Sequence, residues 1–195
     1  MKFLLLIFFT LSFSLPVQAN PDTAREIQNL LEERDSRIKE LLGPEGSEYS
    51  DQQREEIRGI INEIIDYRRM GKFALADKYH ELGSDEQEEF IELFSSIIRD
   101  QSLQQLDIYR AEVIYDDIEV DGDNAKVTTT VIMQERRISV HYRMYRSDDT
   151  WLISDMSIDD AWTAESYRRS FQNIIRRRGF EALIENLRKR AEQTS

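Results

Sequence analysis

The spacing of apolar residues changes twice along the chain, and this change constrains the fold more than any other feature. Up to about residue 110, apolar residues recur every three or four positions, as in the isoleucine stripe between Ile57 and Ile65; this spacing forms one buried face of a helix. From about Arg110 they alternate at every second position, which is typical of strands. Helical spacing returns after Ile158. Helices, then consecutive antiparallel strands, then helices predict an α+β fold with the helices on one side of the sheet.

Turn and cap signals give approximate bounds for these elements. We expect three strands at Ala125 to Gln134, Arg136 to Tyr145 and Trp151 to Ile158. A hairpin turn is expected at 121–124, within the alternating stretch that begins near Arg110. A first helix follows Pro21 and stops at Gly43.

Two later helices are expected to open with the capping-box pattern, in which a serine is followed three residues later by glutamine. The two boxes are Ser50-x-x-Gln53 and Ser84-x-x-Gln87. A shorter helix lies between them, around residues 70–75, and two amphipathic helices close the chain on either side of Gly179.

The N-terminus has the pattern of an export signal. Lys2 is followed by an apolar run from Phe3 to Leu15 and by Val17-Gln18-Ala19, the small-x-small site that a signal peptidase cleaves. We therefore expect a signal peptide at residues 1–19 and one domain at 20–195. The sequence contains no cysteine, so neither a disulfide nor a lipid-modified cysteine is expected.

Charge is distributed unevenly along the chain. Residues 20–195 carry 25 basic and 38 acidic side chains, a net charge of −13, which argues against nucleic acid as a partner. Residues 168–195 alone carry eight basic and three acidic side chains, a net +5, which leaves −18 for residues 20–167. The C-terminal segment is a basic end on an acidic body.

An ordered series of short motifs runs through residues 50–188. Its first part is Asp66-Tyr67, Met70-Gly71, Leu75-Ala76, Tyr79, Gln87, Phe90 and Phe94. Its second part is Tyr142, Trp151, Asp155, Tyr167-Arg168, Phe171, Gly179 and Leu183-Ile184. This series resembles the MlaC-like (toluene-tolerance auxiliary) family of periplasmic phospholipid carriers.

The chain departs from the family pattern at several positions. Tyr67 replaces phenylalanine, Tyr79 replaces tryptophan, and Gly71 stands where the family has alanine. Asp149-Thr150 replaces a glycine before Trp151, and Asp160 replaces a glycine seven residues before Tyr167.

The resemblance implies a cone-shaped domain, like nuclear transport factor two, in which a curved antiparallel sheet and a helix layer enclose a lipid cavity. It also implies a periplasmic protein. Such a protein passes phospholipid between an inner-membrane ABC transporter and an outer-membrane lipoprotein complex. From the residues themselves we expect no cofactor or metal, no stable insertion into membranes, and a monomer.

Lipid carriage through water requires an enclosed apolar cavity. Exposing an acyl chain costs ~0.8 kcal/mol per methylene, on the order of 10 kcal/mol for a chain of ~16 carbons. The alternative for each large apolar residue is ordinary packed core. The candidate lipid-binding residues are Ile64, Tyr67, Met70, Phe73, Phe90, Phe94, Ile97, Val127, Val131, Val140, Tyr142, Met144 and Phe171.

Arginines near the C-terminus are candidates for contacts with other molecules. Arg176, Arg177 and Arg178 precede Gly179, and they either dock an acidic partner or phosphate headgroup or offset the end of a helix. Arg168 and Arg169 are expected to pair with acids such as Asp155 or Asp159.

Catalytic motifs are scarce in the sequence. The two histidines, His80 and His141, are 61 positions apart and lack the spacing of metal ligands. We therefore expect a binding protein rather than an enzyme. Two alternatives remain: an enzyme on the same cone-shaped fold, with Asp66, Tyr142 or His141 facing a small pocket, or an interaction module without a cavity.

Overall fold

The structure is a computed structural model that describes residues 21–44, 46–103, 106–133 and 135–194. The signal peptide expected at residues 1–19 lies outside the described residues.

Helices occupy the first half of the described chain. They are α1 (Pro21–Leu42), α2 (Asp51–Ile64), α3 (Tyr67–Leu75), α4 (Lys78–Glu81) and α5 (Ser84–Leu103), followed by the 3-10 helix η1 (Leu106–Arg110). Two more helices, α6 (Thr163–Arg178) and α7 (Phe180–Thr194), follow the strands. The helices expected from the apolar spacing are all present.

In the sequence, the five strands lie between these two groups of helices, and they form one antiparallel sheet. They are β1 (Glu112–Asp121), β2 (Asn124–Met133), β3 (Arg136–Ser147), β4 (Thr150–Ile158) and β5 (Ala161–Trp162), and their order in the sheet is their order in the chain. This arrangement confirms the predicted α+β class and the three strands assigned from alternation.

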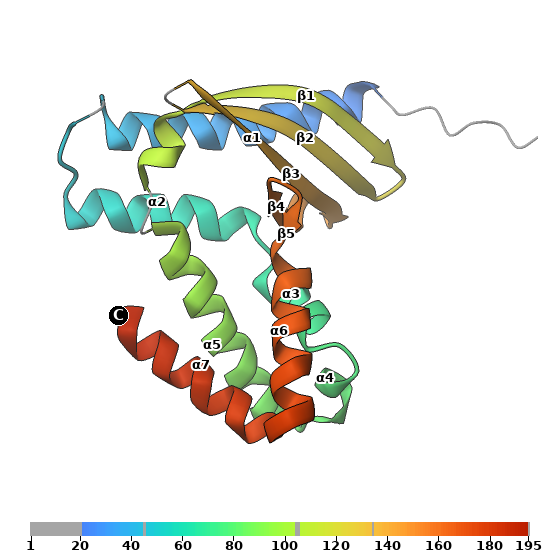
Figure 1. Cartoon of the computed structure of the whole chain (residues 1–195). Helices are drawn as coiled ribbons and strands as arrows, with labels where there is room; N and C mark the ends of the chain where they lie inside the picture. Colours follow the sequence, from blue (N-terminus) through green and yellow to red (C-terminus); the bar gives the residue numbers. More distant parts are fainter. Residues whose placement is uncertain (1–20, 45, 104–105, 134, 195) are drawn as a thin grey trace, which may run out of the picture.

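The sheet curves over α1 and α2 at one end of the molecule (Figure 1). Two irregularities in the pairing bend it: the register shifts at Asp116 in β1 and at Ser154 in β4, where each strand has one extra residue. Helix α6 starts beside β5 and runs away from the sheet, and α7 returns alongside α5. The helices thus form two regions, one under the sheet and one beyond it.

One of the two predicted capping boxes is present. In α2, the Gln53 N–H donates to Ser50 Oγ at 3.2 Å, and the Ser50 N–H donates to Gln53 Oε1 at 2.8 Å. The box predicted at Ser84 is wrong, because α5 begins at Ser84 itself and the Gly83 N–H donates to Glu86 instead, at 2.9 Å. The Gln87 amide donates to the carbonyls of Tyr79 and Leu82, and so joins α4 to α5.

Candidate functional site

A cavity of about 300 Å³ lies between the sheet and helices α1 and α2. Helix α2 supplies Ile60, Ile61 and Ile64 to its wall, together with Ile65 that follows its last residue, and the strands supply a matching row of apolar and tyrosine side chains. The strand residues are Val113, Tyr115, Val131, Val140, Tyr142, Ile153, Met156 and Ile158. The volume is at the lower end of the range for small-molecule sites, which is ~300–1,000 Å³.

Local sequence patterns place these walls. The isoleucine stripe of α2 repeats at helical spacing, so its members share the face that packs toward the sheet. Val140 and Tyr142 are two residues apart in β3 and therefore point to the same side as Val131, whose strand pairs with β3. Ile158 lines the cavity with 47% of its surface exposed, so the apolar lining continues to the molecular surface there.

Four of the thirteen candidate lipid-binding residues line this cavity: Ile64, Val131, Val140 and Tyr142. The structure places the other nine elsewhere. Phe90, Phe94 and Phe171 are buried between helices and form an aromatic cluster with the half-buried Tyr167, where the Phe90 and Phe94 ring centroids are 5.9 Å apart. These rings pack against each other in the core rather than in the wall of this cavity.

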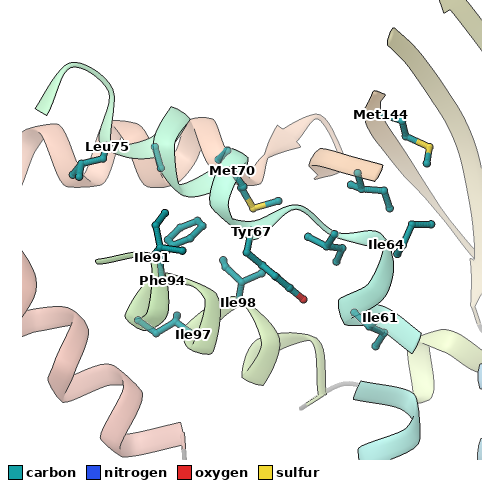
Figure 2. Packing of buried hydrophobic residues seen from close by; sticks show 14 of the residues in the cluster. Ile61, Ile64, Tyr67, Met70, Leu75, Ile91, Phe94, Ile97, Ile98 and Met144 are labelled. Carbon is teal, nitrogen blue, oxygen red and sulfur yellow. The ribbon is translucent and has the colours of Figure 1, made fainter. Parts of the chain in front are cut away.

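The remaining candidates are not among the residues that line the cavity. Figure 2 shows Tyr67 and Met70 of α3 packed near Phe94 and Ile97 of α5, with Ile61 and Ile64 further along toward the sheet. Val127 and Met144 are buried in the same core cluster. Phe73 is the opposite case, because 42% of its surface is exposed. These nine positions lie outside the lining of this cavity, so lipid contact at them remains a prediction.

Helix α1 contributes a wall that the sequence reasoning missed. Leu31, Arg34, Asp35 and Ile38 all line the cavity, and their spacing of three and four residues puts them on one helix face. The sequence feature that could have indicated this wall is the presence of two charged residues, Arg34 and Asp35, beside the apolar stripe of the helix. Asp35 forms an ion pair with Lys39 at 2.7 Å.

Two tyrosines in the wall have hydroxyl groups with raised pKa values. Burial raises the pKa of Tyr142 above its ordinary value, and the neighbouring Tyr109 and Asp35 add to the effect. Burial also raises the pKa of Tyr115, with smaller contributions from Tyr142 and Asp35. Both phenols are therefore neutral at physiological pH, and the lining offers an apolar surface with few polar groups.

The three arginines proposed for docking lie far from this cavity. Arg176, Arg177 and Arg178 form the exposed last turn of α6, at the end of that helix that points away from the sheet (Figure 1). Gly179 caps the helix with φ +83°, and its N–H donates to the Ile175 carbonyl at 2.9 Å. These cations therefore offset the partial negative charge at the C-terminus of the helix, and they also remain accessible to a partner.

The expected partners of Arg168 and Arg169 are wrong. Arg169 pairs with Glu165 at 3.5 Å, and the Arg168 guanidinium lies 5.0 Å from the centre of the Phe73 ring. Asp155 instead accepts the Ala164 N–H at 2.9 Å, near the start of α6, and lies 3.6 Å from Arg143.

Of the three residues considered for catalysis, only Tyr142 lines the cavity. Asp66 caps α3 by accepting the Arg69 N–H at 2.8 Å, and it also accepts the Tyr145 hydroxyl. His141 lies within hydrogen-bond distance of Ser139 and Thr128, at 3.1 and 3.2 Å. Within the described part of the chain, no group of acidic, histidine or cysteine side chains forms a metal site.

Comparisons with known proteins agree with this geometry. A family model described as MlaC protein matches residues 35–189. A solved structure of a phospholipid-binding protein from Ralstonia solanacearum, in complex with a phospholipid, is similar with a TM-score of 0.71 and 19% identity, over 88% of this chain and 97% of that chain. A search of curated proteins finds no match. Among the described residues, no helix is both long and apolar enough to cross a bilayer.

Proposed function

We propose that this chain, which belongs to the MlaC family, is a periplasmic carrier that holds a phospholipid in the cavity between its sheet and helices α1 and α2. The cavity carries the proposal, because its wall of isoleucine, valine and tyrosine replaces water around an acyl chain. Shielding one chain of ~16 carbons is worth on the order of 10 kcal/mol. The export signal expected at residues 1–19 supports the periplasm as the compartment.

The proposed partners are an inner-membrane ABC transporter and an outer-membrane lipoprotein complex. The acidic body of the chain is repelled by anionic bilayers, so we expect lipid exchange to need protein contacts. The candidate contact for an acidic partner is the exposed basic surface of α6, which we define as Arg168, Arg169 and Arg176 to Arg178 together with Phe73 of the adjacent α3. It combines cations with an exposed aromatic ring, a common pairing at interfaces.

We propose a binding protein rather than an enzyme. The phenol of Tyr142 is the one considered catalytic group that reaches the cavity, and its raised pKa makes it a poor proton donor or acceptor near neutral pH.

Organic extraction and mass spectrometry of the exported, purified protein test the proposal. We expect an equimolar amount of a diacyl phospholipid. Protein that is free of lipid and also takes up none from vesicles would contradict carriage and favour an interaction module. A small polar metabolite in place of lipid would favour an enzyme.

A further inference from the structure

We propose that Arg34 of α1 binds the phosphate of the ligand and fixes the end of the cavity at which the headgroup lies. The inference rests on the proposed function and adds to it a residue and an orientation. The ligand chemistry is a phosphate ester attached to acyl chains.

The position of Arg34 is unusual for a charged side chain. It lies on the apolar stripe of α1, between Leu31 and Ile38, and it lines the cavity together with them. Both of these flanking residues are buried, at 9% and 4% exposure. An arginine that served only solubility would be expected on the opposite face of the helix.

The guanidinium of Arg34 is poorly satisfied. Its Nη1 donates to the Leu30 carbonyl of the same helix, at 3.3 Å. Its Nε is buried and has no hydrogen-bond partner among the described residues, and none of their ion pairs involves Arg34. A guanidinium carries five N–H donors, and a buried donor without a partner destabilises the folded protein unless a ligand accepts from it.

The neighbouring acid does not fill this need. Asp35 lies next to Arg34 on the same wall, but its carboxylate pairs with Lys39 at 2.7 Å. Glu32, two residues before Arg34 on α1, is exposed to solvent, where its charge is screened. The cavity wall therefore keeps a positive charge that has no ion-pair partner among the described residues.

A phosphate ester fits this position better than other polar groups. The planar fork of a guanidinium binds two phosphate oxygens at once, and a charge-assisted pair of this kind gains strength where water is excluded. With the phosphate at Arg34, the acyl chains extend along the isoleucines of α2 and the apolar face of β3. The headgroup end would then lie at the α1 side of the cavity.

The test compares two lipids with the same acyl chains and different headgroups. Delipidated protein is incubated with vesicles that contain equal amounts of phosphatidylglycerol and of diacylglycerol, which lacks phosphate, and the bound lipids are counted by mass spectrometry. We expect wild-type protein to favour the phospholipid, and Arg34→Gln to reduce that preference about tenfold or more, since a hydrogen bond to a charged group is worth ~1.5–3 kcal/mol. Total bound lipid should stay close to the wild-type amount.

Matched variants keep the test decisive. Arg37→Gln removes the same charge from an exposed position of α1 outside the cavity lining, and it should leave the preference unchanged. Arg34→Lys keeps the positive charge but lacks the planar guanidinium that can bind two phosphate oxygens at once. It should show an intermediate preference for the phospholipid, and it provides the test even if the glutamine variant fails to fold.

The remaining outcomes distinguish failure of the proposed function from failure of the role of Arg34. Wild-type protein that takes up neither lipid overturns the proposed function itself, and the assignment of Arg34 with it. Uptake with the same preference in wild type, Arg34→Gln and Arg34→Lys overturns only the role of Arg34. Inorganic phosphate alone, at millimolar concentration, should not raise the melting temperature; a rise in wild type that is absent in Arg34→Gln would assign the site to free phosphate.

Discussion

Gly71 of α3 lies so close to Phe94 of α5 that a β-carbon on Gly71 would be 3.1 Å from the Cδ1 atom of that ring. The same β-carbon would meet Ile91 Cδ1 at 2.8 Å and Phe90 Cε1 at 3.4 Å. The MlaC-like pattern has alanine at this position, so the helices approach more closely here than that pattern alone implies. Close contact between α3 and α5 leaves this part of the helix layer without space for a ligand.

We predict that Gly71→Ala destabilises the protein. Overpacking of a buried site costs ~1–3 kcal/mol, whereas alanine is favoured over glycine in a helix by about 1 kcal/mol, so a net loss of up to ~2 kcal/mol is expected. Gly59→Ala on α2 is the control, because nothing lies within 4 Å of its β-carbon and only the gain should remain. Denaturant unfolding of both variants measures the difference. Equal stabilisation by the two alanines would contradict the close packing of α3 on α5.

The aromatic core and the cavity wall predict opposite results for tryptophan. Phe94 is fully buried in the ring cluster, whereas Val131 lines the cavity. Phe94→Trp should therefore cost ~1–3 kcal/mol of stability and leave bound lipid unchanged. Val131→Trp should cost less stability and reduce lipid occupancy, because the added volume enters open space. Thermal melts combined with lipid quantification check both, and the reverse pattern would place the lipid between the helices.

Sequence patterns predicted the elements well because local spacing decides them. The expected strand 125–134 corresponds to β2 at Asn124–Met133, and the expected strand 136–145 to β3 at Arg136–Ser147. The strand expected at 151–158 corresponds to β4 at Thr150–Ile158. Alternation also put Val131, Val140 and Tyr142 on the face that lines the cavity.

The same patterns could not separate a cavity wall from a packed core. Periodicity predicts that Phe90 and Phe171 are buried, but their partners come from helices far apart in the sequence, and those partners decide whether space remains.

Asp160 is a position where the sequence departs from the family pattern and the backbone shows why the family has glycine. It adopts φ +64°, so its backbone has the left-handed conformation that explains the family's glycine, and its carboxylate lies 3.4 Å from His141.

Asp155 should make stability depend on pH. Burial raises the pKa of this carboxyl above its ordinary value, although the N–H groups of Ala164 and Met156 and the charge of Arg143 act in the opposite direction. A carboxyl with a raised folded-state pKa binds its proton more tightly in the folded protein. Its contribution to stability is therefore complete below the unfolded pKa and is lost as pH rises through the folded pKa.

Asp155→Asn measures this contribution, because the amide oxygen can still accept the Ala164 N–H while the titration is removed. We expect wild type to lose stability relative to Asp155→Asn as the pH rises from the ordinary aspartate range through the raised pKa. Denaturant unfolding at a series of pH values gives the difference. A gain of wild-type stability relative to the variant over that interval would show that the hydrogen bonds and Arg143 outweigh burial.

The last prediction concerns the exposed basic surface of α6. Changing Arg176, Arg177 and Arg178 to glutamine removes three exposed cations at the end of α6 that points away from the cavity. If an acidic partner docks there, partner-dependent lipid transfer should become slower and less sensitive to salt, while bound lipid stays the same. Changing Arg25, Arg37 and Lys126 to glutamine is the control, because it removes the same charge from exposed positions on α1 and β2. Fluorescent-lipid transfer at low and high salt distinguishes the two triple variants. If the variant without Arg176, Arg177 and Arg178 transfers lipid at the wild-type rate at both salt concentrations, these arginines do not dock a partner. Their role is then limited to offsetting the partial negative charge at the C-terminus of α6.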